Sequence, residues 1–101
     1  MKTQSFKTYL EKRLNKQEIA DIEKAAALEL KYFRDLQADV SKALQDYMQE
    51  KNLGFNDIVN KLGKTPTQVS NILNGRANLT LASVAQVFAL MKRKPRLYDP
   101  A

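Results

Sequence analysis

The order of apolar and polar residues predicts helices along the whole chain. Apolar residues recur at steps of three and four, which is the period of an α-helix. A first short stripe comprises Phe6, Tyr9, Leu10 and Leu14. A second, longer stripe comprises Ile19, Ile22, Ala26, Leu30, Phe33, Val40, Leu44, Tyr47 and Met48. No alternating pattern typical of a β-strand occurs, so we predict an all-α fold.

The second stripe predicts one unusually long helix. Asn15 followed by Glu18 is suited to cap its start, and the pattern continues to about Asn52. A helix of that length measures about 50 Å at about 1.5 Å per residue, which is longer than a small domain can bury. Two alternatives follow: the helix kinks near residues 31–39, or its first half extends outward.

After Gly54 the pattern changes to three short helices, predicted over residues 55–62, 66–73 and 81–91. Gly63 is suited to end the first of them because glycine readily adopts the left-handed backbone conformation of a helix cap. The core positions predicted for the middle helix are Val69, Ile72 and Leu73. Two short helices joined around a glycine are typical of a helix-turn-helix.

The middle helix carries short polar side chains on its outer face. We predict that DNA bases are contacted by Thr65, Thr67, Gln68 and Asn71. Asparagine and glutamine can form two hydrogen bonds with adenine, and threonine offers a hydroxyl and a methyl group. Thr65 is also the expected helix cap, and Gln68 is either its capping-box partner or a base contact. Asn71 favours DNA contact most, because asparagine in mid-helix is a poor helix former.

Positive charge accompanies this helix. The chain carries a net charge of +6, and residues 64–101 contain six basic residues and one acidic residue. We predict phosphate contacts by Lys64, Asn74, Arg76 and Asn78, together with free backbone N–H groups at Thr67 and Gln68. A basic surface attracts nucleic acid, but a solvated basic surface without a polyanionic partner is equally consistent with charge by itself.

Composition argues against several other classes of protein. The chain contains no cysteine and no histidine, which removes the commonest metal ligands and general base. We therefore predict no enzymatic activity, no metal and no cofactor. No apolar run is long enough to span a bilayer, and the polar amino-terminal residues do not resemble a secretory signal. We expect a soluble, cytoplasmic protein without a membrane partner.

The run GFNDIVNKLGKTPTQVSNILNGRANLTLASVAQVFALM resembles the helix-turn-helix of the XRE family, which includes the Cro and lambda-type repressors. The resemblance covers about residues 36–91 and implies a lambda-repressor-like bundle in a DNA-binding transcriptional repressor. Phe55 stands where that family usually has a phosphate-contacting glutamine, and Val59 where it usually has alanine. A homodimer is expected, because such domains usually read two half-sites about 34 Å apart.

The amino-terminal part, with its stripe of Phe6, Tyr9, Leu10 and Leu14, resembles HigA-like antitoxins. That resemblance implies binding of a RelE/ParE-fold ribonuclease toxin of the HigB type and repression of the shared operon. We therefore divide the chain into a helical arm (1–34), a helix-turn-helix domain (35–92) and a basic tail (93–101). The alternatives are an arm that folds back on residues 19–33 or on a second copy, a phage-like or housekeeping repressor without a toxin, and a protein-interaction module without DNA binding.

Overall fold

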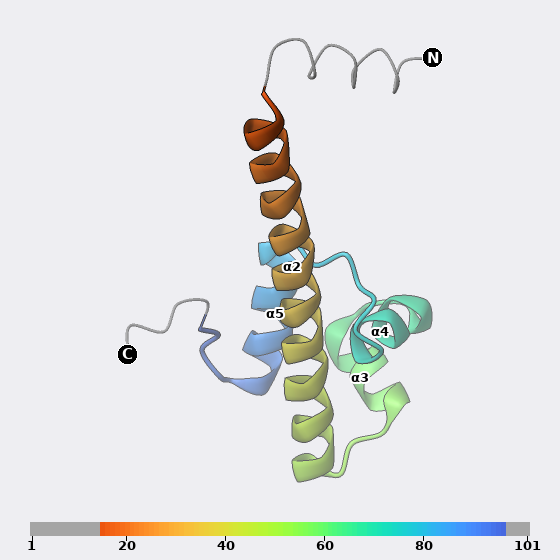
Figure 1. Ribbon diagram of the computed structural model, residues 1–101. Helices are drawn as coiled ribbons and strands as arrows, with labels where there is room; N and C mark the ends of the chain where they lie inside the picture. Colours follow the sequence, from red (N-terminus) through yellow and green to blue (C-terminus); the bar gives the residue numbers. More distant parts are fainter. Residues whose placement is uncertain (1–14, 97–101) are drawn as a thin grey trace. The chain divides into compact units, whose positions relative to one another are not determined.

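The computed structural model describes residues 15–96, and its regular elements are helices (Figure 1). They are α2 (Lys16–Lys51), α3 (Phe55–Leu62), α4 (Pro66–Leu73) and α5 (Leu81–Met91). No β-strand occurs among the described residues, which confirms the predicted all-α fold. None of these helices is long and apolar enough to cross a membrane. The predicted partner-binding residues Phe6, Tyr9, Leu10 and Leu14 lie outside the described residues.

Helix α2 begins where the sequence predicts. The side-chain oxygen Oδ1 of Asn15 accepts a hydrogen bond from the backbone N–H of Glu18 at 2.7 Å, which satisfies one of the free donors of the first turn. The helix then continues for 36 residues. It is helical throughout residues 31–39, with no interruption of its helical structure there.

The chain divides into two compact units, residues 1–33 and 34–101. In the first unit the described residues are Asn15 and the part of α2 that follows it, and most of their side chains are exposed. The exposed large apolar residues there are Ile22, Leu28, Leu30, Tyr32 and Phe33. The larger side chains on the apolar face predicted for residues 19–33 are therefore exposed to solvent.

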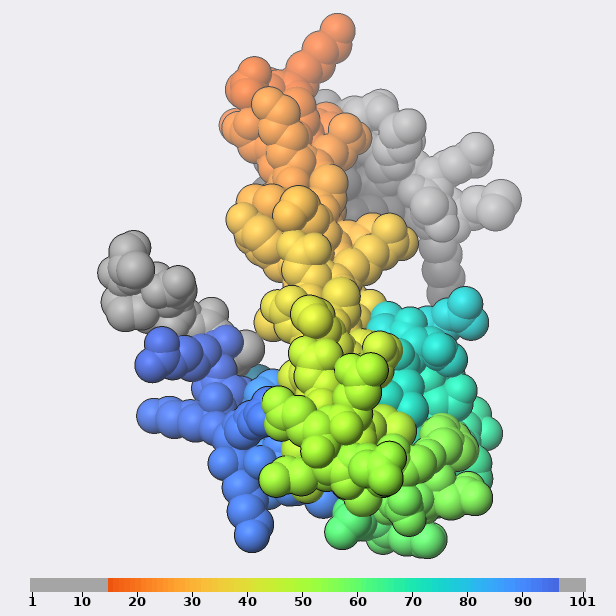
Figure 2. All heavy atoms as spheres, turned by 90° about the horizontal axis from the view of Figure 1, so that it is seen from below, coloured from red at the N-terminus to blue at the C-terminus, as the bar shows by residue number. Residues whose placement is uncertain are grey.

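The second unit contains the hydrophobic core. Every helix contributes to it, with buried side chains from Val40, Leu44, Ile58, Val69, Ile72, Val87 and Met91. Partly buried residues such as Tyr47, Leu62, Leu73 and Phe88 pack around this cluster. Helix α3 contacts both α4 and α5, and Figure 2 shows α3 and α4 (green to cyan) close to the carboxyl-terminal turns of α2 (yellow-green). The predicted inward positions Val69 and Ile72 are thus confirmed.

The ends of the short helices are fixed by left-handed residues. Gly63 has a φ of 64°, and its N–H donates to the carbonyl of Val59 at 3.0 Å, which ends α3. Gly75 has a φ of 67°, and its N–H donates to the carbonyl of Ile72 at 3.2 Å. The N–H of Arg76 reaches the carbonyl of Asn71 at 2.8 Å, which completes a Schellman motif after α4.

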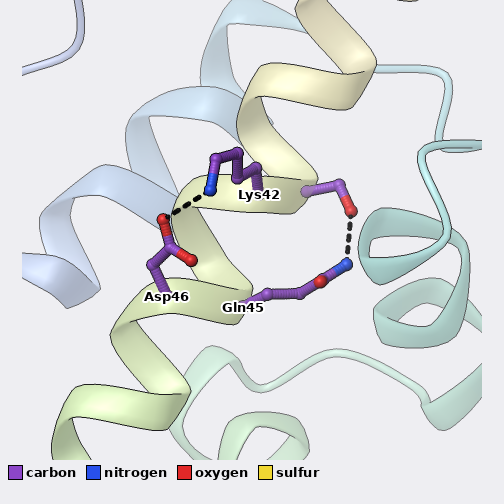
Figure 3. A network of polar contacts seen from close by, with 4 residues as sticks. Lys42, Gln45 and Asp46 are labelled. Carbon is purple, nitrogen blue, oxygen red and sulfur yellow. Dashed lines mark hydrogen bonds and ion pairs between the residues drawn. The ribbon is translucent and has the colours of Figure 1, made fainter.

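A row of polar side chains on α2 holds the carboxyl end of α4. The Ser41 hydroxyl donates to the carbonyl of Leu73, and Gln45 Nε2 donates to the same oxygen at 2.9 Å. Gln45 Nε2 also donates to Ser41 Oγ at 3.0 Å, and this contact of Gln45 is drawn in Figure 3. One α2 turn earlier, Gln37 Nε2 donates to the carbonyl of Ala77 at 2.7 Å. Leu73 lies in the last turn of α4, where carbonyls have no intrahelical partner, so α2 supplies the missing donors there.

Replacement of Leu44 by alanine should destabilise the second unit strongly. Leu44 is 0% exposed at the centre of the core, and Leu→Ala changes at such sites cost about 2–5 kcal/mol because they leave a cavity. Urea unfolding monitored by circular dichroism measures the change. Leu81→Ala is the matched control, because Leu81 is 76% exposed and its truncation should change the unfolding free energy by less than about 0.5 kcal/mol.

Candidate nucleic-acid interface

The first turn of α4 is closed by a reciprocal capping box. Thr65 Oγ1 accepts from the backbone N–H of Gln68 at 3.2 Å, and Gln68 Oε1 accepts from the backbone N–H of Thr65 at 3.0 Å. Pro66 follows as the first helical residue, where its lack of an N–H costs no hydrogen bond. The cap that the sequence predicts at Thr65 is therefore confirmed, and Gln68 is its partner.

The capping box corrects one expectation about the backbone. We expected free N–H groups at both Thr67 and Gln68, but the N–H of Gln68 is already bonded to Thr65. Within the described part of the chain, Thr67 is the residue of this turn whose N–H has no bond to protein. Because the N–H of Gln68 is bonded to the Thr65 hydroxyl, an anion at this helix start would find a free N–H only at Thr67.

The outer face of α4 is polar, and its inner face is buried. The side chains of Thr65, Thr67, Gln68 and Asn71 are all exposed. Val69, on the opposite face of this eight-residue helix, is completely buried. The pattern places the four predicted base contacts together on one accessible surface.

The two carboxamides on this surface are in different states. Asn71 makes no side-chain hydrogen bond to any residue between 15 and 96, so its oxygen and its nitrogen are both available. The oxygen of Gln68 is engaged with the N–H of Thr65, and its nitrogen is available as a donor. Asn71 can therefore pair with an adenine edge without breaking a hydrogen bond. Gln68 has only its Nε2 group uncommitted, and that group is a donor.

A small recess of about 140 Å³ lies beside this face of α4. It is lined by Lys64, Gln68, Asn71, Ile72, Ala77, Asn78, Leu79 and Ser83. The lining contains one charged residue, the half-buried Lys64, and no acidic residue. The structure therefore brings together two predicted base contacts, Gln68 and Asn71, with two predicted phosphate contacts, Lys64 and Asn78.

The other two predicted phosphate contacts lie elsewhere. The Arg76 side chain is exposed, directly after the Schellman motif, and it forms no ion pair within residues 15–96. The Asn74 carboxamide donates to Ser70 Oγ at 3.3 Å, and Asn74 lines a separate hollow together with Asp46. The nearby acidic side chain makes Asn74 the least suitable of the four for binding a phosphate.

Two features of the site were missed from the sequence. Ser83 joins the recess from the first turn of α5, where its N–H donates to the capping hydroxyl of Thr80 at 3.1 Å. The spacing Thr-x-x-Ser is the available signal for this serine. The α2 donors Gln37, Ser41 and Gln45 were also missed, although polar residues at i, i+4 and i+8 beside an apolar stripe indicate a shared face.

No three acidic side chains among the described residues come together in a way that could hold a metal ion. The polar groups of the recess are a lysine, amides and a hydroxyl, which are mostly hydrogen-bond donors. Such an arrangement suits hydrogen-bond acceptors and anions rather than metal cations.

Comparison of the chain with protein-family models, curated protein sequences and solved structures finds no match in any of the three. The function is therefore inferred from the residues of this chain and the chemistry they support.

Thr65→Ala should destabilise the second unit by about 0.5–2 kcal/mol, because it leaves the N–H of Gln68 without its hydroxyl partner. Thr67→Ala is the matched control: its side chain is exposed and makes no hydrogen bond to the described residues, so the loss should be smaller. Thermal and urea unfolding of both variants measure the difference. Equal losses would show that the cap contributes no stability.

Proposed function

We propose that this chain is a sequence-specific DNA-binding transcriptional repressor with a helix-turn-helix of the XRE type, formed by α3 and α4. The observation that carries the proposal is the division of α4 into two faces. Its inner face is anchored in the core through Val69 and Ile72, and its outer face presents exposed polar groups, of which Thr67 and Asn71 make no side-chain hydrogen bond to the described residues. A reading helix requires both properties, a fixed position and exposed donors and acceptors.

In this proposal the amino-terminal part of α4 enters the major groove, which is about 12 Å wide and admits an α-helix. Asn71 pairs with adenine through both atoms of its free carboxamide, and Thr67 offers a hydroxyl to a base edge or a methyl to thymine. The Schellman motif and the donors from α2 hold the carboxyl end of α4. The readers are thus positioned before DNA arrives, which lowers the entropic cost of binding.

Phosphate contacts in this proposal surround α4 on both sides. Lys64 precedes it, and Arg76 and Asn78 follow it in the connection to α5. No acidic residue occurs between Lys64 and Arg96, so this part of the chain adds no repulsion toward a phosphate backbone. These contacts supply affinity without regard to sequence, whereas the α4 side chains supply the discrimination between bases.

A homodimer is part of the proposal. Eight helical residues measure about 12 Å, which corresponds to about three to four base pairs at about 3.4 Å each. One copy therefore reads too short a site to be selective in a genome. Two copies on half-sites about one helical turn apart would double the length that is read.

We further propose that the repressor is the antitoxin of a type II toxin-antitoxin pair, whose partner is a RelE/ParE-fold ribonuclease. The support is the resemblance of the amino-terminal region to HigA-like antitoxins, together with the exposed apolar side chains of Ile22, Leu30 and Phe33. Apolar groups that gather on one exposed face are typical of an interface. The proposed toxin-binding residues are Phe6, Tyr9, Leu10 and Leu14.

A second candidate is a protein-interaction module that keeps the fold without reading DNA. The observation that favours it is Phe55, a large apolar residue that is 37% exposed in the first turn of α3. In the XRE family this position usually holds a phosphate-contacting glutamine. The basic surroundings of α4 oppose this candidate, and the salt dependence of DNA binding separates the two.

Binding to the DNA upstream of its own gene should weaken steeply with salt, because neutralised phosphates release counterions. Arg76→Ala should weaken binding to all sequences alike and reduce the slope of log K against log salt by about 1. Asn71→Ala should leave that slope unchanged and lose about 1–3 kcal/mol of preference for the specific site. Fluorescence anisotropy at several salt concentrations measures both quantities. Salt-independent or undetectable binding would support the interaction module.

The double variant Phe6→Asp, Leu10→Asp should no longer co-purify with a toxin encoded by the neighbouring gene, because two charges are introduced into the apolar stripe. Co-expression followed by affinity purification tests this, and DNA binding of the variant should be unchanged. The control is Lys7→Asp, Glu11→Lys, which changes charges at neighbouring positions outside the stripe. Undiminished capture of the toxin would exclude the stripe from the interface.

A further inference from the structure

Gln68 has an orientation that its hydrogen bonds fix. The donor at its oxygen is the backbone N–H of Thr65, and only the carboxamide oxygen can accept from an N–H group. The nitrogen Nε2 must therefore be the atom left over, with two hydrogens to donate. The assignment does not depend on telling oxygen from nitrogen by their positions.

This orientation limits what Gln68 can recognise. Two-point pairing with adenine requires the carboxamide to present its oxygen and its nitrogen to the base together, so the Thr65 bond must be broken or shared. Donation from Nε2 alone leaves the capping box intact. Breaking that hydrogen bond would cost about fivefold in affinity, and sharing it requires the Thr65 N–H and the adenine amino group to reach the same oxygen together. Donation by Nε2 alone is therefore the less demanding arrangement.

Two other polar groups of the recess, Lys64 and Ser83, are also donors, whereas Asn71 and Asn78 carry both donors and acceptors. Lys64 carries only donors on its ammonium group. The hydroxyl of Ser83 accepts from Thr80 Oγ1 at 3.0 Å, which leaves its own hydrogen free to donate. Ile72, Ala77 and Leu79 line the remainder with apolar atoms and compete for no hydrogen bond.

We propose that Gln68, together with Lys64 and Ser83 of the same recess, binds a group that presents hydrogen-bond acceptors and no donors, and that Gln68 does not read adenine. The proposal rests on the proposed DNA-binding function and divides the two carboxamides of α4 between different partners. Asn71 pairs with adenine, and Gln68 donates to the acceptor group. Two parts of a DNA duplex offer a pair of adjacent acceptors to the two hydrogens of Nε2: the O6 and N7 atoms of guanine in the major groove, and the phosphate oxygens. Thymine O4 is a single acceptor.

Gln68→Glu removes the Nε2 donor without removing the capping box, so it tests the proposal directly. A glutamate at this position can still accept from the N–H of Thr65, since Thr-x-x-Glu is itself a capping box, so the helix start is kept. The change replaces the Nε2 donor with a carboxylate acceptor. Gln86→Glu is the matched control, because it makes the same change of charge at an exposed position of α5 outside the recess.

The experiment selects bound duplexes from a randomised DNA library with the wild-type protein and both variants, then measures affinities by anisotropy at one fixed salt concentration. If Gln68 donates to guanine, the wild type shows a guanine preference at one position, and Gln68→Glu lowers affinity for that site about tenfold and moves the preference toward cytosine. If it donates to a phosphate, Gln68→Glu weakens all duplexes about tenfold more than Gln86→Glu and leaves the preferences unchanged. Either result supports the proposal.

Two results would overturn it. One is an adenine preference that Gln68→Glu abolishes while the asparagine-dependent position stays unchanged. The other is a Gln68→Glu variant that binds every duplex as well as Gln86→Glu does. Thermal unfolding of the variants confirms that the capping box is kept. A wild-type protein that binds no duplex would reject the proposed function itself, which separates that failure from a failure of the Gln68 assignment.

Discussion

Burial of Val69 and Ile72 against Leu44 and Ile58 is the interaction on which the candidate site depends. Helix α4 has eight residues, and isolated helices shorter than about 12 residues are marginal in water. Its helical structure therefore comes from packing on the rest of the second unit. Without that packing, the polar side chains on its outer face would have no fixed spacing and no common direction.

Hydrogen bonds at both ends of α4 add to the stabilisation that the apolar core provides. The carboxyl end of α4 is held by donors from α2, and its amino end by the box between Thr65 and Gln68. Both ends are thus held without using the carboxamide of Asn71, which stays available for a ligand. Gln68 differs from Asn71 because its carboxamide oxygen already stabilises the helix start, so fewer of its atoms are available to contact a ligand.

Helix α2 carries two kinds of surface along one continuous element. From Val40 onward its side chains enter the core and hold α4, whereas the large apolar side chains between Ile22 and Phe33 are exposed. In the proposed function the first surface positions the DNA-reading helix and the second belongs to the partner-binding region. Because exposed apolar area is costly in water, a partner would gain free energy by covering it.

The sequence by itself determined the helices, the caps at Asn15, Gly63 and Thr65, and the inward positions of α4, because each follows from residues a few positions apart. It also indicated which polar residues face outward. Only the tertiary structure decided that Lys64, Gln68, Asn78 and Ser83 share a recess and that Gln37 and Gln45 bind carbonyls near α4. Those contacts depend on how the core orients helices that are distant in sequence. The state of Gln68 was open for another reason: one carboxamide can cap the helix or contact a base, and only the observed hydrogen bond shows that its oxygen serves the cap.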